Sequence, residues 1–87
     1  MNQIKRYPFS FRKHEHDIFY RYNRAKNELD DKRATATPKD IGRYEELIEN
    51  LAKLMCHRPD EKGIVWLTGK EYGLANDCVC WAASMRH

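Results

Sequence analysis

The chain has 87 residues and a net charge of +3, with 41% hydrophobic and 33% charged residues. This length allows one domain, and the hydrophobic content is typical of a folded soluble protein rather than of a disordered chain. No apolar run approaches the roughly 20 residues of a membrane span, and no apolar segment follows Lys5 and Arg6 as it would in a signal peptide. We therefore expect a single cytoplasmic domain over residues 1–87.

Residues 1–10 are expected to form an extended basic and aromatic arm, because Pro8 restricts the preceding residue to extended geometry. A first helix is expected at residues 11–33, after Ser10 as its cap. Its apolar residues share one face but Phe19 and Tyr20 fall outside it, so this pattern is weaker than that of the second helix.

The clearest pattern lies in the second expected helix, at residues 38–57. Its apolar residues recur at steps of three and four, which puts them on one stripe: Ile41, Tyr44, Leu47, Ile48, Leu51, Leu54 and Met55. Thr37 can cap the start, and Pro38 suits the first helical position. The connection before it is short, which favours an antiparallel hairpin with the first helix.

Residues 64–67 form an apolar run that is locally β-prone, and we expect a buried extended crossover there. Pairing with Tyr7–Phe11 as a short ribbon is the alternative. Thr68 and Glu71 match a capping box, which predicts a third helix at residues 69–85. Trp81 and Met85 are expected on its buried face.

The expected fold class is therefore mainly α, a compact three-helix domain in which an antiparallel hairpin is crossed by the third helix. The predicted core consists of Ile18, Tyr22, Leu29, Ile41, Tyr44, Ile48, Leu51, Met55, Val65, Leu74, Cys78, Val79 and Ala82. Apolar residues outside this core, notably Phe19, Leu54 and Trp66, allow a homodimer.

Binding is the function that the sequence favours, because basic and aromatic residues are interleaved near the start of the chain. Residues 1–26 carry seven bases and two acids, and six of the ten aromatic residues lie in the first 22 positions. Such residues are common anchors of protein interfaces, and they can also neutralise phosphates and stack on bases. A solvated helix face with some rings in the core is the simpler structural explanation.

We expect a small non-enzymatic module that inhibits or adapts a larger protein partner, of the kind encoded by viruses and mobile elements. The predicted partner contacts are Arg6, Tyr7, Phe9, Arg12, Phe19, Tyr20 and Arg24. Trp66 and Trp81 are further candidates if their rings are exposed. The alternative is a nucleic-acid-binding protein that uses Lys5, Arg6, Arg12, Lys13, Arg21 and Arg24.

No metal, cofactor or catalytic site is expected. Zinc would need paired ligands in a tetrahedron, whereas Cys78 and Cys80 diverge by roughly 200° on a helix and Cys56 and His57 by about 100°. The serines lack the context of an activated nucleophile. A helix-turn-helix is not favoured, because a long segment separates the second and third expected helices.

Overall fold

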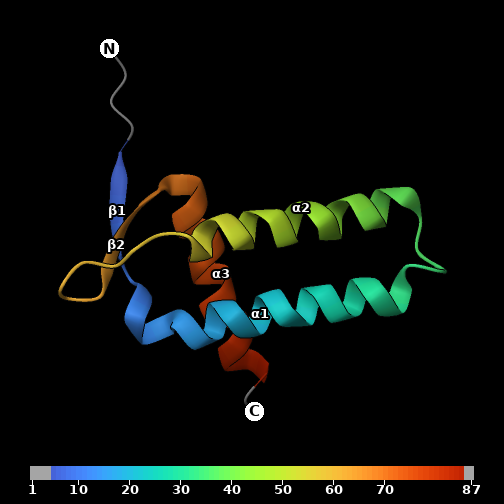
Figure 1. Cartoon of the computed structure of the whole chain (residues 1–87), viewed down its shortest axis with the longest axis horizontal. Coiled ribbons are helices and arrows are strands. Elements are labelled where there is room, and N and C mark those ends of the chain that lie inside the picture. Colours follow the sequence, from blue (N-terminus) through green and yellow to red (C-terminus); the bar gives the residue numbers. More distant parts are fainter. Residues whose placement is uncertain (1–4, 86–87) are drawn as a thin grey trace.

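A computed structural model describes residues 5–85 and shows a mainly α domain with three helices and one two-stranded antiparallel sheet (Figure 1). The elements follow the chain in the order β1 (Arg6–Ser10), α1 (Phe11–Lys32), α2 (Pro38–Met55), β2 (Ile64–Thr68) and α3 (Gly69–Met85). The expected three-helix architecture is confirmed. Among the described residues, no helix is both long enough and apolar enough to cross a membrane.

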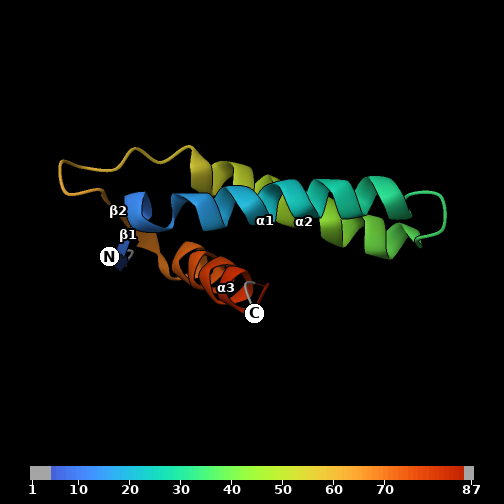
Figure 2. The same cartoon turned by 90° about the horizontal axis from the view of Figure 1, so that it is seen from below.

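The helices α1 and α2 form the expected antiparallel hairpin and run side by side in Figure 1 and Figure 2. The start of α2 is as predicted: Thr37 Oγ1 accepts a hydrogen bond from the backbone N–H of Asp40 at 3.2 Å, and Pro38 is the first helical residue. The helix ends at Met55, slightly before the predicted end. The N–H of Cys56 there bonds to the carbonyl of Lys53, which tightens the last turn.

The run at residues 64–67 is the main departure from the expected fold. It belongs to β2 and pairs antiparallel with β1, rather than crossing the domain unpaired. The arm expected at residues 1–10 is likewise the strand β1 in its second half, and residues 1–4 lie outside the described part. The alternative pairing with Tyr7–Phe11 is therefore the one that forms, except that Phe11 already belongs to α1.

The pairing register of the two strands determines which side chains face the core and which face solvent. Tyr7 is opposite Leu67, and Phe9 is opposite Val65. Because opposite residues point to the same side of a sheet, these four side chains form the inner face. Trp66 lies between the two buried residues of β2, points outward and is 55% exposed.

A tight turn leads the chain into β2. Asp60 Oδ1 accepts hydrogen bonds from the N–H groups of Ile64 at 3.0 Å and Lys62 at 2.9 Å, and these bonds lower the pKa of the carboxyl. Gly63 has a φ of +79°, and its carbonyl accepts a hydrogen bond from the N–H of Arg12 at 3.1 Å. The turn is thus attached to the start of α1.

The third helix, α3, crosses the hairpin and packs mainly against α1 (Figure 2). Its predicted capping box is present: Glu71 Oε1 accepts a hydrogen bond from the N–H of Thr68 at 3.1 Å, and the N–H of Glu71 donates to Thr68 Oγ1 at 3.3 Å. The small residues Ala75, Cys78 and Ala82 are buried, which allows a close approach to the hairpin.

The core lies where the ribbon, α3 and the near half of the hairpin meet. Its buried apolar residues are Phe9, Phe11, Ile18, Ala25, Leu29, Leu51, Leu54, Val65, Leu67, Ala75, Cys78 and Ala82. Six of the predicted core residues are among them. The other predicted ones are only half-buried: Tyr22, Ile41, Tyr44, Ile48, Met55, Leu74 and Val79.

The position of α3 explains why predicted core residues in the far half of α2 are only half-buried. Figure 1 shows that the far half of the hairpin extends beyond α3. Ile41, Tyr44 and Ile48 are half-buried and are not among the residues that pack against the buried core. Leu54, which is expected outside the core, lies instead at the near end of α2 and is 1% exposed. Leu54 is therefore not free to form a dimer contact.

Candidate binding surface

Three residues predicted to contact a partner lie on β1, and they point to different sides. Phe9 is 5% exposed and belongs to the core, which corrects its prediction as a surface contact. Strand alternation is the reason: Tyr7 and Phe9 both face inward, with ring centroids 5.4 Å and 6.3 Å from that of Tyr72. Arg6 is exposed and donates a hydrogen bond to the carbonyl of Trp66 at 3.3 Å.

The four predicted contacts on α1 divide between two faces of the helix. Arg12 and Phe19 are two turns apart and share one exposed face, on which the Phe19 side chain is 44% exposed. Tyr20 and Arg24 are one turn apart on another face, and Tyr20 is 49% exposed. The residues predicted from the sequence therefore do not form one continuous patch.

The face that carries Tyr20 continues onto α3, where Trp81 completes an aromatic cluster. The ring centroids of Tyr20 and Trp81 are 5.2 Å apart, with an angle of 39° between the rings. The guanidinium carbon of Arg21 lies 4.9 Å from the centroid of Trp81. Both distances are in the range of favourable ring packing and cation–π contacts. One indole thus connects an aromatic ring and a cation of α1.

A small hollow opens beside this cluster, with a volume of about 250 Å³ and walls formed by Asp17, Tyr20, Ala82 and Met85. Asp17 is 6% exposed, and its Oδ2 lies 3.4 Å from His14 Nδ1. Met85 is 48% exposed, which corrects its expected burial.

The aromatic cluster, the cations around it and the rim of the hollow together form one region, which we call the aromatic-cationic surface. It consists of Lys13, Tyr20, Arg21, Arg24, Trp81 and Met85.

The sequence predicts this surface only in part. Trp81 is expected mainly on the buried face of the third helix, and Arg21 and Lys13 are expected to contact only nucleic acid. No local pattern shows that Tyr20 meets Trp81, because the two rings are far apart in the sequence. The available signal was that Tyr20 lies outside the apolar stripe of α1, so that any cover for its ring had to come from another element.

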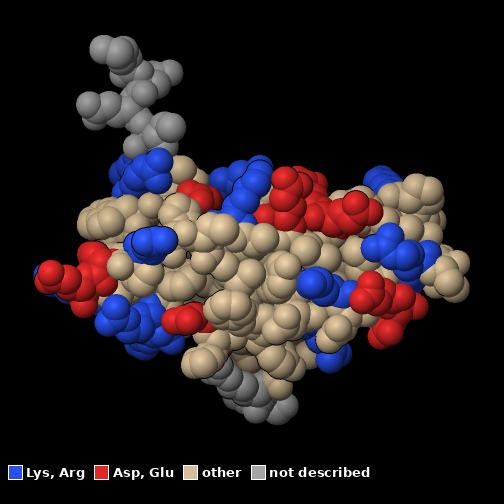
Figure 3. Space-filling model, viewed as in Figure 1, with Lys and Arg blue, Asp and Glu red and all other residues tan. Residues whose placement is uncertain are grey.

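The six cations of the nucleic-acid alternative are distributed over several parts of the domain. Lys5 and Arg6 belong to the ribbon end, and on α1 Arg12 lies on a different face from Lys13, Arg21 and Arg24. Arg24 Nε also pairs with Glu28 Oε1 at 3.3 Å. Figure 3 shows Lys and Arg interspersed with Asp and Glu over the visible face.

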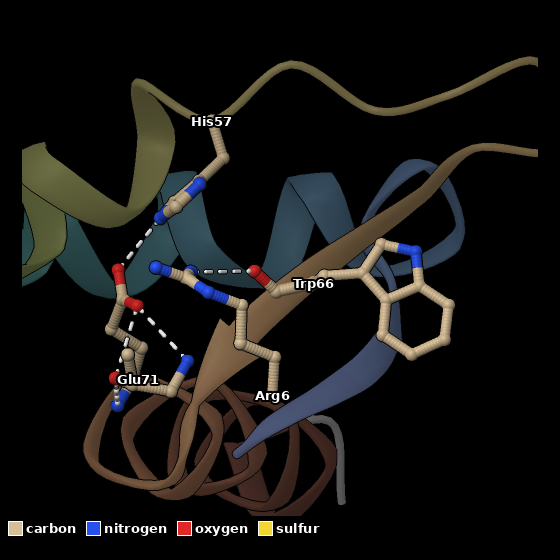
Figure 4. A network of polar contacts seen from close by, with 5 residues as sticks. Arg6, His57, Trp66 and Glu71 are labelled. Carbon is tan, nitrogen blue, oxygen red and sulfur yellow. Dashed lines mark hydrogen bonds and ion pairs between the residues drawn. The ribbon is translucent and has the colours of Figure 1, made fainter. Parts of the chain in front are cut away.

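A separate polar cluster connects α2, the ribbon and α3 (Figure 4). His57 Nε2 lies 2.6 Å from Glu71 Oε2, while Glu71 Oε1 accepts a hydrogen bond from Thr68 Oγ1 at 3.0 Å. Partial burial raises the pKa of Glu71, but the hydrogen bonds from His57 and Thr68 outweigh it and keep the pKa below its ordinary value. Because both carboxylate oxygens are engaged, Glu71 fastens the start of α3 to the end of α2.

The three cysteines are free thiols, with Cys56 and Cys80 exposed and Cys78 buried. Burial raises the pKa of the Cys78 thiol to about 11, so this thiol stays protonated at neutral pH. Within residues 5–85, no group of three or more His, Cys, Asp or Glu side chains is placed to hold a metal ion.

Comparison with protein family models, curated proteins and solved structures gives no match. The function of this small, mainly α domain is therefore inferred from its surface chemistry.

Proposed function

We propose that this protein is a non-enzymatic binding module that inhibits or adapts a larger protein partner through the aromatic-cationic surface. The supporting observation is that Tyr20 and Arg21 pack against Trp81 at the surface of the domain. Tyr, Trp and Arg are the residue types that most often dominate the binding energy of protein interfaces. Contacts between α1 and α3 already hold these side chains, so they lose less conformational freedom on binding than mobile side chains would.

We place the protein in the cytoplasm. All three cysteines are free, and Cys56 and Cys80 are exposed. An odd number of cysteines, two of them exposed thiols, suits a reducing compartment, because an oxidising one would favour disulfides between molecules.

Affinity capture with matched variants tests the proposal. The wild type and two double variants are immobilised, and proteins captured from a lysate of the source cells are identified by mass spectrometry. The first variant, Tyr20→Ala with Arg21→Ala, alters the aromatic-cationic surface. The control, Arg12→Ala with Phe19→Ala, removes the same kinds of side chain from the other exposed face of α1. Circular dichroism confirms that both variants remain helical.

The expected result is a protein that the wild type and the control retain and that the Tyr20/Arg21 variant loses. The purified partner should then bind that variant at least about thirtyfold more weakly, which corresponds to roughly 2 kcal/mol for the loss of interface anchors. A partner lost only from the Arg12/Phe19 control would place the binding surface on the other face of α1. Equal capture by all three proteins would contradict the proposal.

The alternative function is nucleic-acid binding, which is supported by the seven bases among the nine Lys, Arg, Asp and Glu residues of positions 1–26. The acidic groups that lie among these cations weaken it, because phosphate binding benefits from a continuous positive surface. Binding to mixed single-stranded oligonucleotides should be measured at two salt concentrations. A logarithmic slope of about −0.7 per neutralised phosphate would favour this alternative, and no binding at low salt would exclude it.

A further inference from the structure

We infer that the partner segment that docks on the aromatic-cationic surface is an acidic peptide with a single large apolar anchor residue. This inference rests on the proposed function and adds the chemistry of the partner. It follows from the charges at the surface, from the contact of Arg21 with Trp81 and from the size of the adjacent hollow.

The charges that face solvent on this surface are mainly positive. Lys13 and Arg24 are exposed on α1, on either side of Tyr20, and Arg21 lies beside the same ring cluster. Three carboxylates lie near these cations: Asp17 is 6% exposed, Glu28 is paired with Arg24, and Asp77 is exposed on α3 one turn before Trp81. Lys13 and Arg21 form no ion pair with another described residue, so their charges are available to a partner. Complementary charge on the partner therefore means Asp or Glu side chains.

Arg21 can bind a carboxylate while it remains in contact with Trp81. Its guanidinium carbon lies 4.9 Å from the centroid of Trp81, a distance that brings the cation against the indole. A guanidinium that contacts an aromatic ring through its flat face still presents N–H groups along its edge, and that edge matches the two oxygens of a carboxylate. Because the contact with Trp81 limits the motion of Arg21, less conformational entropy is lost when the carboxylate binds.

The hollow beside the cluster accepts an apolar side chain. Tyr20, Ala82 and Met85 supply apolar atoms to its walls, and its volume is about 250 Å³. Pockets for small-molecule ligands usually measure about 300–1,000 Å³, so this one suits a single side chain better than a free ligand. Met85 is unbranched and exposed, and it can adjust to an aromatic ring or to a long aliphatic chain.

A protein segment fits these features better than nucleic acid does. The apolar atoms that Ala82 and Met85 supply to the hollow offer a phosphate backbone no hydrogen-bond donor, so nucleic acid would leave this part of the surface unused. A peptide can alternate its carboxylates with an apolar residue, so that charge meets charge while the apolar side chain enters the hollow.

Tryptophan fluorescence provides a direct test, because the chain has two tryptophans and only Trp81 belongs to the aromatic-cationic surface. Trp66 is exposed elsewhere, on β2. In a Trp66→Phe background, Trp81 is the sole indole reporter. Three probes are titrated: a short peptide of Glu and Asp with one central Phe, the same peptide with Gln and Asn in place of the acids, and the acidic peptide with Ala in place of Phe.

The acidic Phe peptide should change the Trp81 emission and bind at least about tenfold more tightly than either altered peptide. The amide peptide loses the charge interactions with the cations, and the Ala peptide loses the apolar contact in the hollow; each loss should lower the affinity about tenfold. Arg21→Lys should weaken binding although the charge is kept, since the planar edge is lost. Arg12→Gln, on the other face of α1, should bind as the parent does, and circular dichroism should show all variants folded.

Equal binding of the acidic and amide peptides, or no binding of the acidic Phe peptide, would contradict the inference. The same holds if Arg12→Gln weakens binding as much as Arg21→Lys does. If a captured partner depends on Tyr20 and Arg21 while the acidic peptide fails, the inference is wrong and the proposed function stands. If capture does not depend on these residues, the proposed function itself fails.

Discussion

His57 Nε2 and Glu71 Oε2 lie 2.6 Å apart, and this contact connects the segment after α2 to the first turn of α3 (Figure 4). The other oxygen of Glu71 completes the capping box with Thr68. One carboxylate therefore stabilises a helix start and an interhelical contact together.

Glu71→Gln should lower the free energy of unfolding by about 1–2 kcal/mol, because the amide keeps the shape but lacks the charge that strengthens the hydrogen bonds with His57 and Thr68. Urea denaturation at neutral pH, followed by circular dichroism, measures this change. Glu46→Gln is the control, since Glu46 is an exposed carboxylate on α2. A similar loss in both variants would show that net charge, rather than the contact with His57, is responsible.

Stability should also depend on pH through Glu71. Its pKa in the folded protein lies below the ordinary value of 4.5, so its ionised form stabilises the folded state fully above that pH. This contribution is lost as the pH falls below 4.5 and through the folded-state pKa. In urea denaturation between about pH 7 and about pH 3, the difference between the wild type and Glu71→Gln should therefore shrink with acidification. A constant difference would contradict a charge effect.

The ribbon register predicts opposite outcomes for two neighbouring residues of β2. Leu67 is 0% exposed, so Leu67→Ala should cost about 2–5 kcal/mol through lost burial and the cavity left behind. Trp66 is 55% exposed, and Trp66→Ala should cost less than about 1 kcal/mol although the side chain removed is larger. Thermal or urea unfolding measures both. The reverse order would mean that the strand pairs in a register shifted by one residue.

Two glycines should respond to alanine with opposite signs. Gly63 has a φ of +79°, and a Cβ there would lie 2.7 Å from Arg12 Cβ, so Gly63→Ala should destabilise the protein by about 1–3 kcal/mol. Gly42 is helical with nothing within 4 Å of a Cβ, so Gly42→Ala should stabilise it by about 0.5–1 kcal/mol. Unfolding midpoints provide the comparison. If Gly63→Ala were neutral, the turn would have to adopt another conformation.

The helices could be predicted from the sequence because their signals are local. Thr37 and Pro38 specify the start of α2, and the Thr68–Glu71 box specifies the start of α3. The sheet was harder to predict, because β1 begins in a short stretch interrupted by Pro8 and its partner lies beyond both long helices. Burial of Phe9 depends on that distant pairing.

The binding surface was predictable in composition but not in extent. Exposure of Tyr20 follows from its place outside the apolar stripe of α1, whereas its contact with Trp81 depends on the crossing of α3. Arg12 and Phe19 lie on a different face from Tyr20 and Arg24, because successive residues of a helix point about 100° apart. Residues that are close in the sequence of α1 therefore belong to two separate surfaces.

Pairing of β1 with β2 also has a consequence for biosynthesis. The helical hairpin can assemble from adjacent segments once Met55 has left the ribosome. The partner strand of β1, which is β2, is complete only when Thr68 has also left it. During that interval the ring of Phe9 lacks its eventual cover from Val65 and the residues around it. The packing of Phe9 therefore has to wait for a strand that is synthesised much later than its own.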